Sequence, residues 1–143
     1  MNVSNLLATK GNEVATISQE RTVSDALTLL KERRIGALVV TGATSPLVGI
    51  FSERDAVRAL ATSGAEALGF SVAELMSSEV ATCTEETSVT ELMGLMTERR
   101  IRHVPVVSEG RLIGMVSIGD VVKARFDELE LDKKELLDYV SGR

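Results

Sequence analysis

Two short segments of the chain carry the same pair of chemically useful side chains at the same spacing. Ser52 stands three residues before Asp55, and Ser117 stands three residues before Asp120. Each serine follows a short apolar run typical of a strand, and the residues after it favour a helix. The N-terminus of a helix offers free backbone N–H groups and a positive dipole end, which suit a phosphate. A carboxylate there can accept hydrogen bonds from both adjacent hydroxyls of a ribose.

The same pattern also has a purely structural interpretation. A serine that caps a helix and an aspartate in its first turn stabilise the start of that helix without any ligand. The residue types and their spacing therefore leave two interpretations open at each pair, a helix cap and a ligand contact.

A second candidate for chemistry is the dipeptide formed by Arg102 and His103, directly before the apolar run at residues 104–107. Arginine presents a rigid fork of N–H donors, and histidine can add a second cation, so the pair suits an anionic ligand. The alternative is a surface arginine beside a partly buried, hydrogen-bonded histidine.

The two Ser–Asp pairs belong to two copies of one longer unit. At an offset of 66, nine of the twenty-six positions in residues 16–41 are identical in the second copy, and at an offset of 65, six of thirteen in residues 47–59 are identical. Gly36 stands where the second copy has Arg102, so the first copy lacks this cation. Arg54, inside the first Ser–Asp segment, could compensate.

Each copy has the pattern of a β-α-β-β-α unit, with an amphipathic helix, a hairpin of two apolar runs and a second helix. A short strand is expected before each first helix, at residues 14–18 and 80–84. A unit of this size buries too little surface to be stable alone. We therefore expect an α+β fold in which two units, residues 1–66 and 67–143, pack with pseudo-two-fold symmetry.

The composition argues against several classes of function. The net charge of −5, the absence of tryptophan and an aromatic content of 3% disfavour nucleic-acid binding. No apolar run approaches the roughly 18 residues of a membrane span, and the N-terminus lacks a secretory signal. A single cysteine, Cys83, fits a reducing, cytoplasmic setting. One Cys and one His argue against a metal cluster, and no nucleophile–base pair indicates an enzyme.

Three motifs resemble those of a known family. They are "RHVPVV" and "GMVSIGDVVK" in the second copy and "GIFSERDAVR" in the first. Together with the tandem units, they resemble a pair of cystathionine-β-synthase-type (CBS) domains, the Bateman module. The resemblance implies an adenosine-containing ligand between the two domains, with AMP the first candidate and ATP, ADP or NAD(H) as others. It also implies energy or redox sensing and frequent homodimers.

The resemblance assigns roles to particular residues. The serine and aspartate of each Ser–Asp pair would contact phosphate and ribose, and Arg102 with His103 would reach the phosphates in one site with Ser117 and Asp120. Ser52, Arg54 and Asp55 would form the pseudo-symmetric site. An apolar wall for adenine is expected from Ile101 and Pro105, together with Ile35, Leu38 and Val104. Thr16 and Thr82 are weaker candidates for ligand hydrogen bonds. The alternative function is a protein-interaction module that regulates a partner enzyme such as a thioredoxin-like protein, with nucleotide binding marginal.

The two ends of the chain add further helices. A leading helix is expected to end at Gly11, and residues 118–140 can run as one long helix. An apolar stripe along that helix is interrupted by Lys133 and consists of Val122, Phe126, Leu129, Leu136 and Val140. Such a stripe packs either on the chain's own core or on a second subunit. Because the stripe needs a cover, we expect a homodimer.

Overall fold

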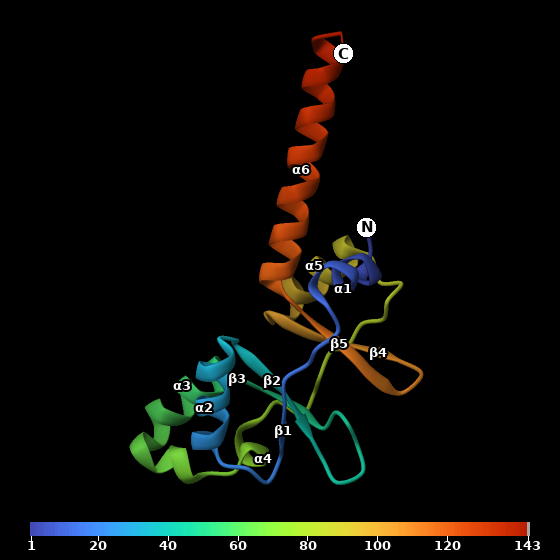
Figure 1. Cartoon of the computed structure of the whole chain (residues 1–143). Coiled ribbons are helices and arrows are strands. Elements are labelled where there is room, and N and C mark those ends of the chain that lie inside the picture. The colour runs from blue at the N-terminus through green and yellow to red at the C-terminus, as the bar shows by residue number, and fades with distance from the viewer. Residues whose placement is uncertain (143) are drawn as a thin grey trace.

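The computed structural model describes residues 1–142 and contains two repeated units of strands and helices (Figure 1). The first unit comprises β1 Thr16–Ser18, α2 Val23–Arg33, β2 Ala37–Thr41, β3 Gly49–Ser52 and α3 Glu53–Ser63. The second comprises α5 Val89–Arg99, β4 His103–Ser108, β5 Arg111–Ser117 and α6 Ile118–Val140. The remaining helices are α1 Val3–Lys10, the 3-10 helix η1 Gly64–Gly69 and α4 Val72–Leu75. The predicted α+β fold of two repeated units is confirmed.

The repeated Glu-Arg-Arg-Ile segment ends the first helix of each unit. Its second arginine, Arg34 or Arg100, adopts a left-handed conformation with φ of 54° and caps α2 or α5. The amide of the following isoleucine then donates to a carbonyl in the last turn, Ile35 to Leu30 and Ile101 to Met96. The duplicated phrase is therefore a helix stop that turns the chain toward β2 or β4.

The sheets of the two units differ in one strand. In the first unit, β2 lies between a parallel β1 and an antiparallel β3. In the second, β4 pairs with β5, and the strand expected at residues 80–84 is reduced to one parallel bridge between Cys83 and Val106. The Val39 amide donates to Ala15 in the first unit. Pro105 occupies the position equivalent to Val39 and has no N–H to donate, which explains the shorter pairing.

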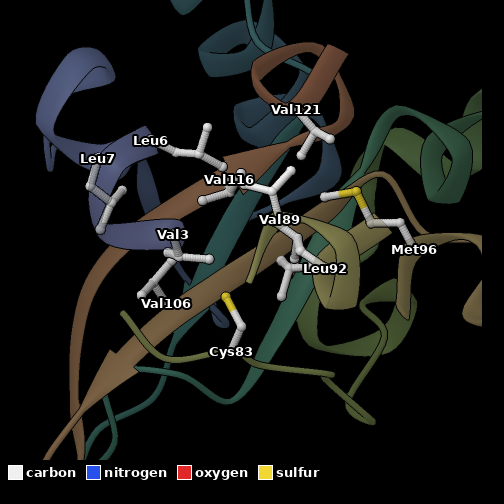
Figure 2. Packing of buried hydrophobic residues seen from close by; sticks show 11 residues of the cluster. Val3, Leu6, Leu7, Cys83, Val89, Leu92, Met96, Val106, Val116 and Val121 are labelled. Atoms are coloured by element: carbon white, nitrogen blue, oxygen red, sulfur yellow. The ribbon is translucent and has the colours of Figure 1, made fainter. Parts of the chain in front are cut away.

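The two hydrophobic cores do not follow the predicted division at residues 66 and 67. Helix α1 precedes the first unit in sequence, yet Val3, Leu6 and Leu7 pack in the core of the second unit (Figure 2). Conversely, Val72 of α4 packs in the core of the first unit. Each core is thus closed by a segment that lies before or beyond its own repeat.

The packing of these segments explains a glycine that occurs in both units. A Cβ atom on Gly114 would lie 2.7 Å from Leu7 of α1, and one on Gly49 would lie 2.6 Å from the sulfur of Met76. Side chains at these positions would push the covering segments away from β5 and β3. Gly114 therefore allows α1 to lie close to the second unit, and Gly49 allows the segment at Met76 to lie close to the first.

Helix α6 begins at the second unit and projects away from both units (Figure 1). Its bounds agree with the predicted helix at residues 118–140. Val121 is buried near its start, whereas most apolar residues farther along are exposed. None of the helices within residues 1–142 has the length and apolar character needed to cross a membrane.

Candidate functional site

Two clefts open between the units and are related by the internal repeat. The larger has a volume of about 670 Å³ and the smaller of about 440 Å³. Each cleft joins the strand–helix junction of one unit to the helix-stop segment of the other unit. Residues 52–55 and 99–103 line the larger cleft, whereas residues 33–37, Ser117 and Asp120 line the smaller.

The structure places most of the predicted site residues in these clefts. The larger cleft is lined by Ser52, Arg54, Asp55, Ile101 and Arg102. Asp120 lines the smaller cleft, and both His103 and Ser117 line the two clefts. Five predicted residues line neither: Leu38, Val104 and Pro105 are buried in the sheets, and Thr16 and Thr82 are exposed elsewhere.

The grouping of these residues differs from the sequence-based expectation. Arg102, His103, Ser117 and Asp120 were expected to form one site because all four belong to the second unit. The backbones do meet, since the Ile118 amide donates to the Arg102 carbonyl over 2.8 Å. Arg102 nevertheless lines the larger cleft with Asp55, while Asp120 lines the smaller one. Each site therefore combines residues of both repeats.

Both Ser–Asp pairs are helix caps. The Ser52 amide donates to Asp55 Oδ2 over 2.8 Å, and the Asp55 amide donates back to Ser52 Oγ over 3.4 Å. Ser117 and Asp120 repeat these bonds at 2.8 and 3.3 Å. Each cap uses one carboxylate oxygen, Oδ2, so the cap and a ligand contact are compatible. The two interpretations that the sequence left open do not exclude each other.

Lys10, the last residue of α1, makes the two clefts unequal. Its ammonium donates to Asp120 Oδ2 over 2.7 Å and to the Met115 carbonyl over 2.6 Å. Burial alone would raise the pKa of Asp120, but hydrogen bonds from Lys10 and Ser117 and the charge of Lys10 outweigh it and lower this pKa. Within residues 1–142, Asp55 forms no equivalent ion pair.

Lys10 could not be identified from the sequence as a site residue. It stands outside both repeats and lies 110 positions from Asp120 along the chain. The only local signal was Gly11, which correctly indicated the end of α1 and therefore placed Lys10 in the last turn.

The larger cleft carries an excess of positive charge. Five arginines line it against three acidic residues: Arg54, Arg58, Arg99, Arg100 and Arg102 against Glu53, Asp55 and Glu79. Arg54 is held in place by a 3.0 Å hydrogen bond from Nη1 to the Arg100 carbonyl, which is exposed at the end of α5. Several guanidinium groups around one cleft suit a phosphate-bearing ligand.

His103 lies where the two units meet. A Cβ atom on Gly36 would be only 3.3 Å from His103 Cε1, so the imidazole covers Gly36 of the first unit. Burial, followed by the charges of Lys10 and Arg102, lowers the pKa of His103, and this effect exceeds the opposite one from Asp120 and Glu53. Burial of His103 therefore disfavours its imidazolium form in the free protein.

Two small repeated units of strands and helices, with an arginine-rich cleft between them, define a tandem α+β module. The family model of the CBS domain matches residues 3–62 and 72–127. The chain therefore belongs to the CBS domain family, as the sequence motifs predicted.

Relatives and solved structures have the same tandem organisation. The CBS domain-containing protein CBSX3, mitochondrial, of Arabidopsis thaliana is 41% identical over 125 residues, which is 85% of this chain and 61% of the plant protein. A CBS-domain containing protein of Agrobacterium tumefaciens is 45% identical, with a TM-score of 0.85 over 87% of this chain and 92% of that one. A CBS domain protein of Pyrobaculum aerophilum complexed with AMP is 29% identical, with a TM-score of 0.79 over 93% and 99% of the chains.

Proposed function

We propose that the chain is a non-catalytic regulatory module that binds an adenine nucleotide between its two CBS units and reports energy or redox state through a change in conformation. AMP is the first candidate, and ATP, ADP and NAD(H) share its adenosine and phosphate chemistry. The protein from P. aerophilum, which was crystallised with AMP, supports this class of ligand. Membership of the CBS family favours regulation over catalysis.

The observation that carries the proposal is the composition of the larger cleft. Asp55 lies at the start of α3 with one oxygen engaged in the helix cap, and arginines from both units surround the same volume. The carboxylate suits ribose hydroxyls, and the guanidinium groups suit phosphate. A volume of about 670 Å³ lies within the range of small-molecule sites.

The larger cleft is the site that we expect a nucleotide to occupy first. The charge of Asp120 in the smaller cleft is already paired with Lys10, whereas Asp55 has no such ion pair within residues 1–142. The smaller cleft also has only one more basic than acidic residue, with Lys10, Arg33 and Arg34 against Glu13 and Asp120. Two classes of site with different affinities follow from these differences.

Isothermal titration with AMP, followed by ATP and NADH, tests the proposal. Asp55→Asn keeps an oxygen for the helix cap but removes the negative charge and one acceptor. Loss of bonds to a charged group costs about 1.5–3 kcal/mol, so the tighter site should weaken roughly ten- to hundredfold. Asp120→Asn is the matched variant and should leave that site unchanged. Equal AMP affinity in wild type and Asp55→Asn would refute the assignment.

The second candidate function is a protein-interaction module for a partner such as a thioredoxin-like enzyme. The observation in its favour is that Val57 and Val122, which are equivalent in the repeat, are 64% and 60% exposed. The same exposure supports our proposal of a homodimer. Light scattering should give twice the chain mass for the homodimer. A monomer that binds a purified thioredoxin-like protein one to one without nucleotide would favour the second candidate.

A further inference from the structure

The projecting part of α6 carries apolar residues at the spacing of a coiled-coil seam. Positions 122, 126, 129, 133, 136 and 140 alternate between intervals of four and three residues, which is the d–a alternation of a heptad repeat. Five of these positions are apolar, and each of the five is 60–74% exposed: Val122, Phe126, Leu129, Leu136 and Val140. We call these six positions the α6 seam.

The α6 seam is separate from the packing of the CBS units. The buried contacts of α6 are made near its start by Val121, with Ile118 and Ala124 packed against the second core. The family match ends at residue 127, so the seam from Leu129 onward lies beyond the matched CBS domain. Figure 1 shows this part of α6 running away from both units. Neither the core nor the clefts account for its apolar residues.

We propose that the α6 seam pairs with the same seam of a second copy of this chain, as a parallel two-stranded coiled coil. A seam of two positions in every seven is narrower than the apolar face with which a helix covers a globular core. Such a seam fits another helix of the same spacing, and a second copy supplies that helix by definition. From residue 122 to residue 140 it runs for about 27 Å at 1.5 Å per residue.

The charges that flank the seam favour the parallel orientation. An antiparallel pair with full overlap would be centred at residue 131, midway between Val122 and Val140. It would bring Glu130 against Glu130 of the partner subunit and Asp132 against Asp132 of the partner subunit. Like charges directly opposed across a seam are destabilising. In the parallel pair, each residue at these two positions is separated from its copy by the seam itself.

Lys133 limits the number of strands. In the parallel register it faces Lys133 of the partner subunit across the seam, which weakens the pair but is compatible with two strands. Each ammonium can extend into solvent beside Asp132 of the partner subunit, with its stem along the seam. A single lysine in the seam is compatible with two strands, whereas larger bundles bury that position more completely.

Two exposed leucines provide a matched test of the seam. Leu136 lies in the seam and Leu131 lies outside it, and they are 63% and 57% exposed. Leu136→Lys should weaken self-association of the full chain at least about tenfold in sedimentation equilibrium, because each dimer loses two buried leucines. Leu131→Lys makes the same chemical change and should leave self-association unchanged. Equal effects of the two substitutions, or none from Leu136→Lys, would overturn the proposal.

A disulfide tests the parallel orientation. The natural Cys83 is buried, and its burial raises the pKa of its thiol to about 11, so it should not interfere under mild oxidation. Val140→Cys in the parallel seam places two thiols side by side and should give a disulfide-linked dimer on a non-reducing gel. Asp138→Cys, two residues away but outside the seam, should not. Failure of Val140→Cys to crosslink, or equal crosslinking of both variants, contradicts the parallel seam whether or not nucleotide binds.

Discussion

Replacing Lys10 with methionine tests whether the N-terminal helix controls access to the smaller cleft. Methionine keeps an apolar stem of similar length but removes the ammonium that bonds Asp120 and the Met115 carbonyl. We expect two results: the free energy of unfolding falls at neutral pH, and Asp120 becomes available to the ribose of a ligand.

The size of both effects follows from the exposure of the pair. The side chains of Lys10 and Asp120 are 33% and 25% exposed. The strength of their interaction should therefore lie between that of a shielded charge-assisted bond, about 1.5–3 kcal/mol, and that of a surface ion pair, about 0.2–1 kcal/mol. We therefore expect a loss of about 1 kcal/mol. This corresponds to a fall in Tm of roughly 2–4 °C and to a roughly fivefold gain in affinity for a ligand that no longer competes with Lys10 for the charge of Asp120.

The pH dependence of the effect has a definite sign. Because the folded pKa of Asp120 lies below its ordinary value of 3.8, the stability that Asp120 adds is present above that value. It is lost as the pH falls through the folded pKa. The difference in Tm between wild type and Lys10→Met should therefore be full at pH 7 and shrink in strong acid.

Thermal unfolding followed by circular dichroism measures the first effect, with Lys134→Met as the control because Lys134 is exposed on α6. Adenosine is the appropriate probe for the second effect, since it has no phosphate whose binding could suffer from the lost cation. An NMR titration should show tighter binding near Asp120. If Lys10→Met melts and binds adenosine as the wild type does, Lys10 does not restrain Asp120.

Further predictions concern the contact between the units and the shortened strand. Gly36→Val should crowd His103 and lower the free energy of unfolding by about 1–3 kcal/mol. Gly94 on α5 has open space around it, so Gly94→Ala should raise the free energy of unfolding by about 0.5–1 kcal/mol. Chemical denaturation measures both changes. Pro105→Val restores an N–H opposite Ala81, and hydrogen exchange should then show a protected amide at residue 105, which a fully exchanging amide would contradict. His103, the one histidine in the sequence, should titrate below 6.5 by NMR in the free protein and shift upward when AMP binds, because bound phosphate favours the imidazolium.

Local patterns were sufficient to predict most of the secondary structure. Capping residues of a type that sequence reveals, Thr22 and Ser88, start α2 and α5, and their side chains accept hydrogen bonds from the third residue of the helix. The apolar spacing of each helix then defines its buried face. These features depend on residues within one turn or one hairpin, so a single sequence contains the information that determines them.

The features in which the structure differs from these expectations depend on distant residues. The strand expected at residues 80–84 required a donor at the position of Pro105, more than twenty residues later. The assignment of α1 to the first unit was equally reasonable from sequence order, yet Leu7 packs over Gly114 in the second unit. Lys10 and Asp120 meet only because of that packing. The composition of each cleft is therefore set by tertiary contacts that no local pattern encodes.

The contact between Gly36 and His103 gives a physical reason for the difference between the two copies. Gly36 of the first unit lies against His103 of the second where the units meet, and a Cβ atom at residue 36 would crowd the imidazole at 3.3 Å. Once the second unit holds Arg102 and His103 at this place, the first unit must stay small, and the cations gather in the larger cleft. The smaller cleft receives its cation from outside the repeat, through Lys10, which neutralises the aspartate that a ribose would need. Duplication of one unit has thus produced two unequal sites, and the inequality starts at a single crowded position between them.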